Sequence, residues 1–355
     1  MLSNSNQTIS KTIMFLRFPL IVAVVFIHTE LTPPTETGLY PTYDLIRHII
    51  SDEFARIAVP LFFFFSGFLF FYNSDFSAKT YQSKLKKRVR TLLIPYIFWN
   101  LLILPITYLS QISTPSMVFS DQALIIDYNW FDYLKIFWAR SGGDGFPIYV
   151  PFWFIRDLMV MIVLSPIIYL FIKYCKFYGV QFLGILWLFK LCPNIPGFSI
   201  TAFFFFSFGA WFSLNNRDFT SDFRPLRWLT TILYMILVPI SIYSWYHNYS
   251  NYTQILGTIV GLIALISWTA YGVENNRLKT NALLAGSSFF VFAYHGKPIT
   301  LVARVWGMRI FPGNEFMILV GYFLLPTIIV VLGVGIYALM RKYLPTFTSI
   351  ITGGR

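Results

Sequence analysis

Residues 61–72 read LFFFFSGFLFFY, and residues 201–212 read TAFFFFSFGAWF. Such stretches leave a soluble domain with almost no polar side chain to show to water. The whole chain follows the same trend, because 56% of its 355 residues are apolar and only 12% are charged, whereas soluble domains carry roughly 25% charged residues. The composition therefore predicts a polytopic membrane protein.

Ten stretches are long and apolar enough to cross a bilayer, or nearly so: 12–30, 54–72, 91–110, 150–172, 177–191, 199–214, 228–246, 254–272, 283–303 and 316–340. A helix needs about 20 residues to cross the hydrocarbon core, so the fifth and sixth stretches are short. We expect an all-α bundle of about ten transmembrane helices. Residues 1–355 are predicted to form a single integral-membrane domain, with no appended soluble domain.

The net charge of +12 raises the question of a nucleic-acid partner. Ten spans place both termini on one side of the membrane, and if that side is cytoplasmic the inner loops collect most of the Lys and Arg residues. This bias is the usual positive-inside pattern. Topology therefore explains the positive charge, and a nucleic-acid partner is excluded. Both termini are predicted to be cytoplasmic, and the lipid bilayer is the partner that the protein is predicted to contact.

Two predicted outer connections, residues 31–53 and 111–149, are long enough to take part in function. The second combines Trp130, Tyr133 and Trp138 with several carboxylates, a composition that suits a sugar-facing lid. The alternative is an interfacial aromatic belt, which such residues commonly form.

The stretch RFPLIVAVVFIH, residues 17–28, places an arginine and a histidine at the two ends of an apolar run. At about 100° per residue, the eleven-residue spacing puts Arg17 and His28 on one helix face, about 16 Å apart along the axis. Ionisable residues inside spans are costly and usually functional, so this face suggests a polar path into the protein. The alternative is a snorkelling Arg17 and an interfacial His28.

Three further segments carry candidate residues. KLKKRVRTLLIPY (84–96) places Arg88 and Arg90 at the mouth of the third span, where arginine suits bidentate phosphate binding. The alternatives are ordinary positive-inside charge or the binding of anionic lipid. PFWFIRDLM (151–159) holds Arg156 inside the fourth span. SSFFVFAYHGKPI (287–299) holds His295, followed by a Gly-Lys-Pro that can break the helix; an interhelical hydrogen bond is the alternative role.

No metal site is expected from the sequence. The two cysteines, Cys175 and Cys192, lie at segment ends without the spacing of a metal site or a disulfide framework. No HExxH motif, Walker loop or Gly-x-Ser-x-Gly elbow occurs. His48 and His247 fall in predicted outer loops, and the sequence gives them no role.

In order, four of these motifs resemble those of the membrane-bound acyltransferase family 3. They are Arg17 and His28 with ten residues between them, FFFFSGFLF (62–70) with its Ser66, Arg88-Val89-Arg90 followed by LLIP, and YHGKP (294–298). The resemblance covers nearly the whole chain. It implies an O-acyltransferase, in the first instance an O-acetyltransferase, in the inner or plasma membrane of a bacterium.

The resemblance also implies a mechanism. Cytoplasmic acyl-CoA, acetyl-CoA by default, would deliver its acyl group to a hydroxyl of a cell-surface polysaccharide or lipid-linked glycan. Arg88 and Arg90 would hold the donor phosphates, and His28 would act as general base or as acyl carrier, assisted by Arg17. The substrate-lining candidates are listed together: Ser66, Trp153, Arg156 and His295.

Two other functions remain open at this point. A secondary transporter would use Arg17, His28, Arg156 and His295 as an ion or proton relay, but it gives no reason for an Arg-x-Arg at the inner mouth. A flippase or polymerase for lipid-linked sugars would need larger outer loops than this chain has.

Overall fold

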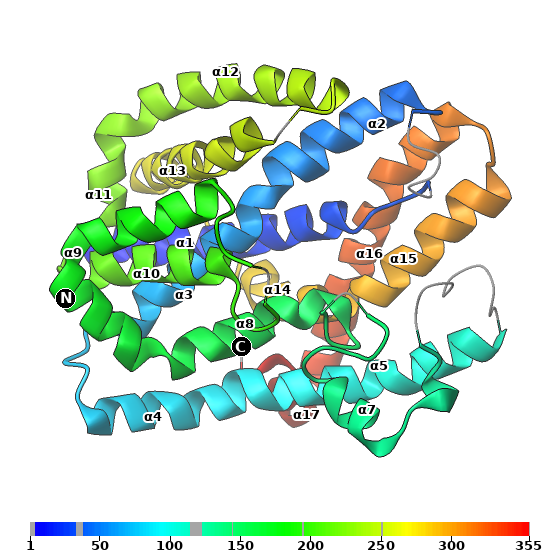
Figure 1. Ribbon diagram of the computed structural model, residues 1–355, viewed down its shortest axis with the longest axis horizontal. Helices are drawn as coiled ribbons and strands as arrows, with labels where there is room; N and C mark the ends of the chain where they lie inside the picture. Colours follow the sequence, from blue (N-terminus) through cyan, green and yellow to red (C-terminus); the bar gives the residue numbers. More distant parts are fainter. Residues whose placement is uncertain are drawn as a thin grey trace. The chain divides into compact units, whose positions relative to one another are not determined.

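The computed structural model describes residues 4–32, 38–113, 123–143, 145–193, 195–249 and 251–354. Within these ranges every regular element is a helix and none is a strand (Figure 1). The prediction of an all-α fold is therefore confirmed. Six helical segments of the described residues are long and apolar enough to cross a membrane: Asn6–Ile27, Pro41–Phe71, Ala78–Ile112, Phe219–Tyr246, Tyr252–Glu274 and Glu315–Tyr343.

A seventh span results if the helices Val150–Val163 and Ser165–Leu188 are counted as one, although they meet at a bend of 64°. Two shorter apolar helices, Ile200–Leu214 and Ala282–Tyr294, add to these. The polytopic architecture is thus confirmed, whereas the number of ten spans and the cytoplasmic side of the termini stay predictions.

Two predicted boundaries coincide with breaks in the helices. The backbone of Lys176 leaves the helical region, with φ of 52°, between the predicted fourth and fifth spans. In the predicted ninth span, one helix ends at Tyr294 and the next begins at Gly296, so the break expected at Gly-Lys-Pro falls at His295. A break in a buried helix is tolerated where other groups satisfy the freed backbone.

The second span was predicted to begin at residue 54, after an outer loop, and this boundary is wrong. Helix α2 begins at Pro41 and continues through a π-helical segment, η2, and a short turn, η3, into α3. Proline at the first helical position favours the start. Polar residues can lie in this helix because they pair with one another, as described below.

The chain forms two compact units, one of residues 1–69 and 208–339 and the other of residues 70–207 and 340–355. The following elements lie wholly or mostly in the first unit: α1 (Asn4–Ile27), α2 (Pro41–Arg47), η2 (His48–Phe54), η3 (Ala55–Ile57), α3 (Ala58–Phe71), α11 (Phe219–Phe223), η7 (Arg224–Leu226), α12 (Arg227–Tyr246), α13 (Tyr252–Glu274), α14 (Ala282–Tyr294), α15 (Gly296–Val305), η8 (Trp306–Ile310) and α16 (Glu315–Tyr343). Helix α10 (Ile200–Leu214) crosses the boundary between the units.

The elements of the second unit are α4 (Ala78–Arg88), η4 (Val89–Leu93), α5 (Ile94–Ser113), η5 (Ile125–Asp127), α7 (Trp130–Lys135), η6 (Val150–Phe152), α8 (Trp153–Val163), α9 (Ser165–Leu188) and α17 (Pro345–Thr352). Helices α4 and α5 continue each other through η4 (Figure 1). The C-terminal helix α17 packs on α5 and η4, and Trp99 donates a hydrogen bond to the carbonyl of Ile351 at 3.0 Å.

Helix α1 is central to the first unit because it packs against α13 and α14. Helices α12 and α13 lie side by side (Figure 1). Gly261 of α13 makes close packing possible there, since a Cβ atom would come within 2.8 Å of the Tyr234 ring on α12. Small residues at helix contacts are the usual means of close packing within a membrane.

Helices α3 and α10 approach each other still more closely. A Cβ atom on Gly209 would lie 1.9 Å from the backbone oxygen of Phe64. Phenylalanine rings surround this contact, with Phe64 in edge-to-face contact with Phe208 and Phe212 at centroid distances of 5.2 and 5.8 Å. The Phe-rich sequences that decided the fold class therefore form an aromatic core around one glycine.

We predict that Gly209→Ala destabilises the protein by about 1–3 kcal/mol, because the added methyl group collides with backbone that has no room to move. Gly335→Ala on α16 is the matched control, since a Cβ there meets nothing within 4 Å and alanine favours the helix. Thermal unfolding of the purified proteins in detergent measures both. Equal melting temperatures for the two variants would contradict the close contact.

Candidate active site

Of the predicted pair, Arg17 lies on helix α1 and His28 lies at the C-terminal end of that helix. The helix is continuous to Ile27, and His28 is the next residue. On a wheel of about 100° per residue, both fall within the arc of the helix's buried side chains, which include Leu16, Leu20, Ile21, Val24 and Val25. Their shared face therefore points into the protein, which favours a functional role over snorkelling.

His28 lies against His295, the candidate from the predicted ninth span. The two ring centroids are 5.2 Å apart, with the planes tilted by 46°. His295 is fully buried, with 0% of its surface exposed, at the junction of α14 and α15. Residues separated by most of the chain are thus brought together, and the sequence had named both of them without pairing them.

The hydrogen bonding of His295 fixes which nitrogen is available. Its Nδ1 lies 2.7 Å from the carbonyl oxygen of Phe292, and because a carbonyl can only accept, Nδ1 carries the hydrogen. Nε2 is then left with its lone pair, and among the described residues it has no hydrogen-bond partner. A buried acceptor without a partner is uncommon and often marks a functional site.

The surroundings of the pair determine its chemistry. The ion pairs among the described residues include neither His28 nor His295, so no carboxylate there offsets the cost of a positive charge on either ring. A neutral imidazole with a free lone pair can accept a proton. The pair can therefore supply a general base, together with a second ring that orients it.

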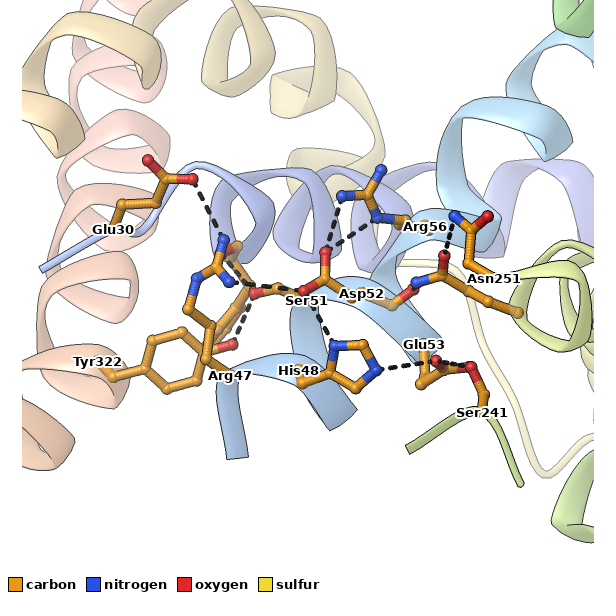
Figure 2. A network of polar contacts seen from close by, with 12 residues as sticks. Glu30, Arg47, His48, Ser51, Asp52, Glu53, Arg56, Ser241, Asn251 and Tyr322 are labelled. Atoms are coloured by element: carbon orange, nitrogen blue, oxygen red, sulfur yellow. Dashed lines mark hydrogen bonds and ion pairs between the residues drawn. The ribbon is translucent and has the colours of Figure 1, made fainter. Parts of the chain in front are cut away.

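A network of polar side chains adjoins the end of α1 that carries His28 (Figure 2). Ser51 of η2 donates a hydrogen bond of 2.9 Å to the carbonyl of Phe26, two residues before His28. Its hydroxyl also lies 2.7 Å from that of Tyr322.

His48 belongs to this network, contrary to its prediction as a loop residue without a role. Its Nδ1 lies 3.4 Å from Asp52 and its Nε2 lies 3.3 Å from Glu53. A π-helix closes its hydrogen bonds between residues i and i+5, so η2 brings positions four and five residues away to the same side of His48. The His-x₃-Asp-Glu spacing was the signal that the sequence offered.

Asp52 is the centre of the network. Its Oδ1 accepts hydrogen bonds from both Nε and Nη2 of Arg56, at 2.9 and 2.8 Å, and Arg47 lies 3.5 Å from its other oxygen. Arg47 also pairs with Glu30 at 3.2 Å. Three carboxylates, counting Glu53, thus face two arginines and one histidine.

The two candidate arginines of the donor site lie in the other unit, at the junction of α4 and η4. Arg88 is the last residue of α4 and is half-buried, whereas Arg90 lies within the π-helical turn η4 and is exposed. Exposure makes Arg90 the better placed of the two to reach a ligand. π-Helical turns within α-helices are frequent at functional sites.

Arg156 forms its hydrogen bonds to groups of the second unit, to which it belongs. Only 4% of its surface is exposed, Nε donates to Asp157 at 2.9 Å, and Nη1 donates to the carbonyls of Trp138 and Gly145. The guanidinium thereby ties the 138–145 segment to α8. Trp153, at the start of α8, and Ser66, within α3, are both half-buried, and no described contact brings either of them to the histidine pair.

The lid predicted within residues 111–149 is folded where it is described; residues 114–122 and 144 lie outside the described ranges. Asn129 and Asp132 form a capping box at the start of α7. Hydrogen bonds from the Ser141 hydroxyl and the Asn129 backbone lower the pKa of the Asp132 carboxyl. Trp130 stays exposed beside Phe131, as either a lid or an aromatic belt requires.

No group of three His, Cys, Asp or Glu side chains in the described ranges is arranged to hold a metal ion.

Comparison with known proteins gives the site its context. A family model described as an acyltransferase domain matches residues 11–339. The range includes each predicted site residue from Arg17 to His295.

The succinoglycan biosynthesis protein ExoH of Rhizobium meliloti is 25% identical to this chain over 370 residues, which cover 99% of the chain and 94% of ExoH. No solved structure gives a significant match. Because the family model covers nearly all of a helical chain whose arginine and histidine motifs had indicated the same family, the chain belongs to the membrane-bound acyltransferase family 3.

Proposed function

We propose that this acyltransferase moves an acyl group from cytoplasmic acyl-CoA to a hydroxyl of a cell-surface polysaccharide or lipid-linked glycan, with acetyl-CoA as the default donor. The observation that carries the proposal is the contact of the half-buried His28 with the fully buried His295, in a chain that the acyltransferase family model covers. The name of the relative ExoH refers to the biosynthesis of a glycan, which supports a glycan acceptor. We also propose that the membrane crossed by this multi-pass protein is a bacterial plasma membrane.

In the proposed reaction His28 acts as general base. It takes the proton of the acceptor hydroxyl as that oxygen attacks the thioester carbonyl. The new carbon–oxygen bond forms, the carbon–sulfur bond breaks, and the proton passes from the imidazolium to the thiolate of the departing CoA. Ester and free CoA are the products, and His28 returns to its neutral state.

His295 is proposed as the positioning residue of this pair. Its Nε2 has no partner among the described residues, and with the ring centroids 5.2 Å apart a rotation of the His28 ring would let Nε2 accept the N–H of His28. That bond would fix the tautomer of His28 and leave its other nitrogen free to act as base. The oriented ring of a catalytic triad works on the same principle, with a carboxylate as the acceptor. Here a neutral acceptor is used, which avoids burying a further charge.

Donor binding is proposed for Arg90 and Arg88, with the exposed Arg90 as the principal contact to the phosphates. The neighbouring basic side chains of α4, which include Lys86 and Lys87 in its last turn, add positive charge at the same place. Arg17 stays a candidate for assisting His28 or the donor. Trp153, Ser66 and Arg156 remain candidates for lining the acceptor site, although Arg156 has most of its donors engaged within the chain.

The transporter alternative has no support from the comparisons, because the family model is described as an acyltransferase domain and the name of the relative refers to biosynthesis. Radiolabelled acetyl-CoA separates the two functions directly. An acyltransferase places the label on glycan in membrane vesicles, whereas a carrier does not.

We predict that His28→Ala lowers kcat for acyl transfer by about 10²–10⁴-fold, the usual contribution of a general base. The control is His247→Ala, which removes an exposed histidine at the end of α12. Transfer of label from acetyl-CoA to glycan is measured in vesicles that contain each variant. Full activity of His28→Ala would rule out its assignment as base.

His295→Ala is expected to lower kcat by about tenfold or more and to change the pH profile of kcat, because His28 loses the acceptor that orients it. KM for acyl-CoA should stay the same. His295→Gln should recover part of the activity, since its amide oxygen can accept near the position of Nε2. An unchanged pH profile in His295→Ala would mean that the residue does not act through His28.

Arg90→Ala should raise KM for acyl-CoA by roughly tenfold with little change in kcat, because a phosphate contact stabilises ground state and transition state alike. The KM of Arg90→Lys should lie between those of Arg90→Ala and the wild type, since lysine keeps the positive charge but lacks the planar guanidinium. Lys79→Ala, an exposed cation at the start of the same helix, is the control. A KM equal to that of the wild type would remove Arg90 from the donor site.

A further inference from the structure

The first unit contains a cavity of about 350 Å³ that the proposed chemistry does not use. It lies between η2, the end of α12 and the start of α13, and it is lined by His48, Asp52, Arg56, Ser241, Trp245, Asn248, Tyr249, Asn251 and Gln254. Figure 2 shows several of these side chains converging from different elements. The volume is at the lower end of the range for small-ligand pockets.

The wall of this cavity combines an aromatic surface with neutral polar groups. The ring of His48 stacks on one side of the Trp245 indole, with centroids 4.5 Å apart and planes 13° from parallel. The half-buried indole also lines the cavity. Amides from Asn248, Asn251 and Gln254 both donate and accept hydrogen bonds, as sugar hydroxyl groups do.

The charges in and around the cavity are balanced. Asp52 is paired with Arg56, Arg47 and His48, and Glu53 is held by Ser241 at 2.6 Å. No excess of positive charge is left to attract phosphate or carboxylate, and no excess of negative charge is left for a cation. A neutral polar ligand therefore suits this wall better than an ion does.

The polar groups are also held in place before any ligand binds. Gln254 donates through Nε2 to the backbone oxygen of Asp52 at 3.0 Å and accepts from Asn251 at 3.3 Å. The rim is accessible, since the side chain of Arg56 is 55% exposed and Tyr249 is 63% exposed. Fixed polar groups beneath an accessible rim lower the cost of ordering on binding.

We propose that this cavity is the acceptor subsite, and that it binds one neutral pyranose ring of the glycan against Trp245. The apolar face of the sugar packs on the indole, and its hydroxyl groups bind Gln254, Asn251 and Arg56. This inference rests on the proposed function. It is consistent with the position of η2, because Ser51 binds the backbone of α1 at Phe26, two residues before His28.

The subsite is tested by binding, without an acyl donor. Saturation-transfer difference NMR is recorded on the full-length protein in detergent, with methyl β-D-glucopyranoside and methyl β-D-galactopyranoside as probes. Wild type should transfer saturation to the ring protons of at least one glycoside. Trp245→Ala should weaken that binding by about tenfold or more. If neither glycoside receives saturation from the wild type, the proposal fails.

Two variants separate lost binding from lost structure. Tyr246→Ala is the matched control, since it changes the next residue of α12, which is 75% exposed and does not line the cavity. It should bind as the wild type does. Trp245→Phe should keep part of the binding and the melting temperature of the wild type. Equal binding by Trp245→Ala and the wild type would overturn the subsite, as would displacement of the glycoside by inorganic phosphate.

The same experiments distinguish failure of the subsite from failure of the proposed function. His28→Ala should lose acyl transfer and keep glycoside binding. Normal acyl transfer by Trp245→Ala at every acceptor concentration would reject the subsite and leave the acyltransferase function standing. Glycoside binding by a wild-type protein that transfers no acyl group would reject the acyltransferase function and leave the glycoside-binding cavity standing.

Discussion

The rest of the structure depends on one constraint, which is that a polar group buried among apolar helices must find a partner within the chain. At the end of α1 this constraint is met almost everywhere. Asp52 pairs with Arg47, Arg56 and His48, and Ser51 is held between Phe26 and Tyr322. Among the described residues, Nε2 of His295 and Nε2 of His48 are buried without a hydrogen-bond partner. Unsatisfied ring nitrogens beside a paired network are the arrangement expected where a ligand or a proton completes a site.

Several candidate functional residues of this chain lie where the backbone departs from regular α-helix. The π-helical segment η2 brings both Asp52 and Glu53 to His48, and the turn η4 carries Arg90. The junction between α14 and α15 falls at His295. Each irregularity changes the direction of side chains that a continuous α-helix would hold elsewhere.

Much of the site could be predicted from sequence because intramembrane charge is rare. Arg17, His28 and His295 stood out from apolar surroundings, and the spacing of the first two on one helix face follows from α-helical geometry. The network of His48 was missed for the opposite reason. The residues of this network are polar and lie next to turn-forming residues, so the sequence predicted a loop. They are stable inside a helix because they pair with distant groups such as Ser241.

The sequence by itself determined the all-helical membrane class, the family motifs and the candidate chemistry, because apolar content and rare buried charges are local properties of the chain. The tertiary structure decided which candidates meet. It joined His28 to His295 across most of the chain, and it made a cavity from η2, α12 and α13. Such contacts depend on helix packing, bends and π-turns, which side-chain periodicity along a single helix does not specify.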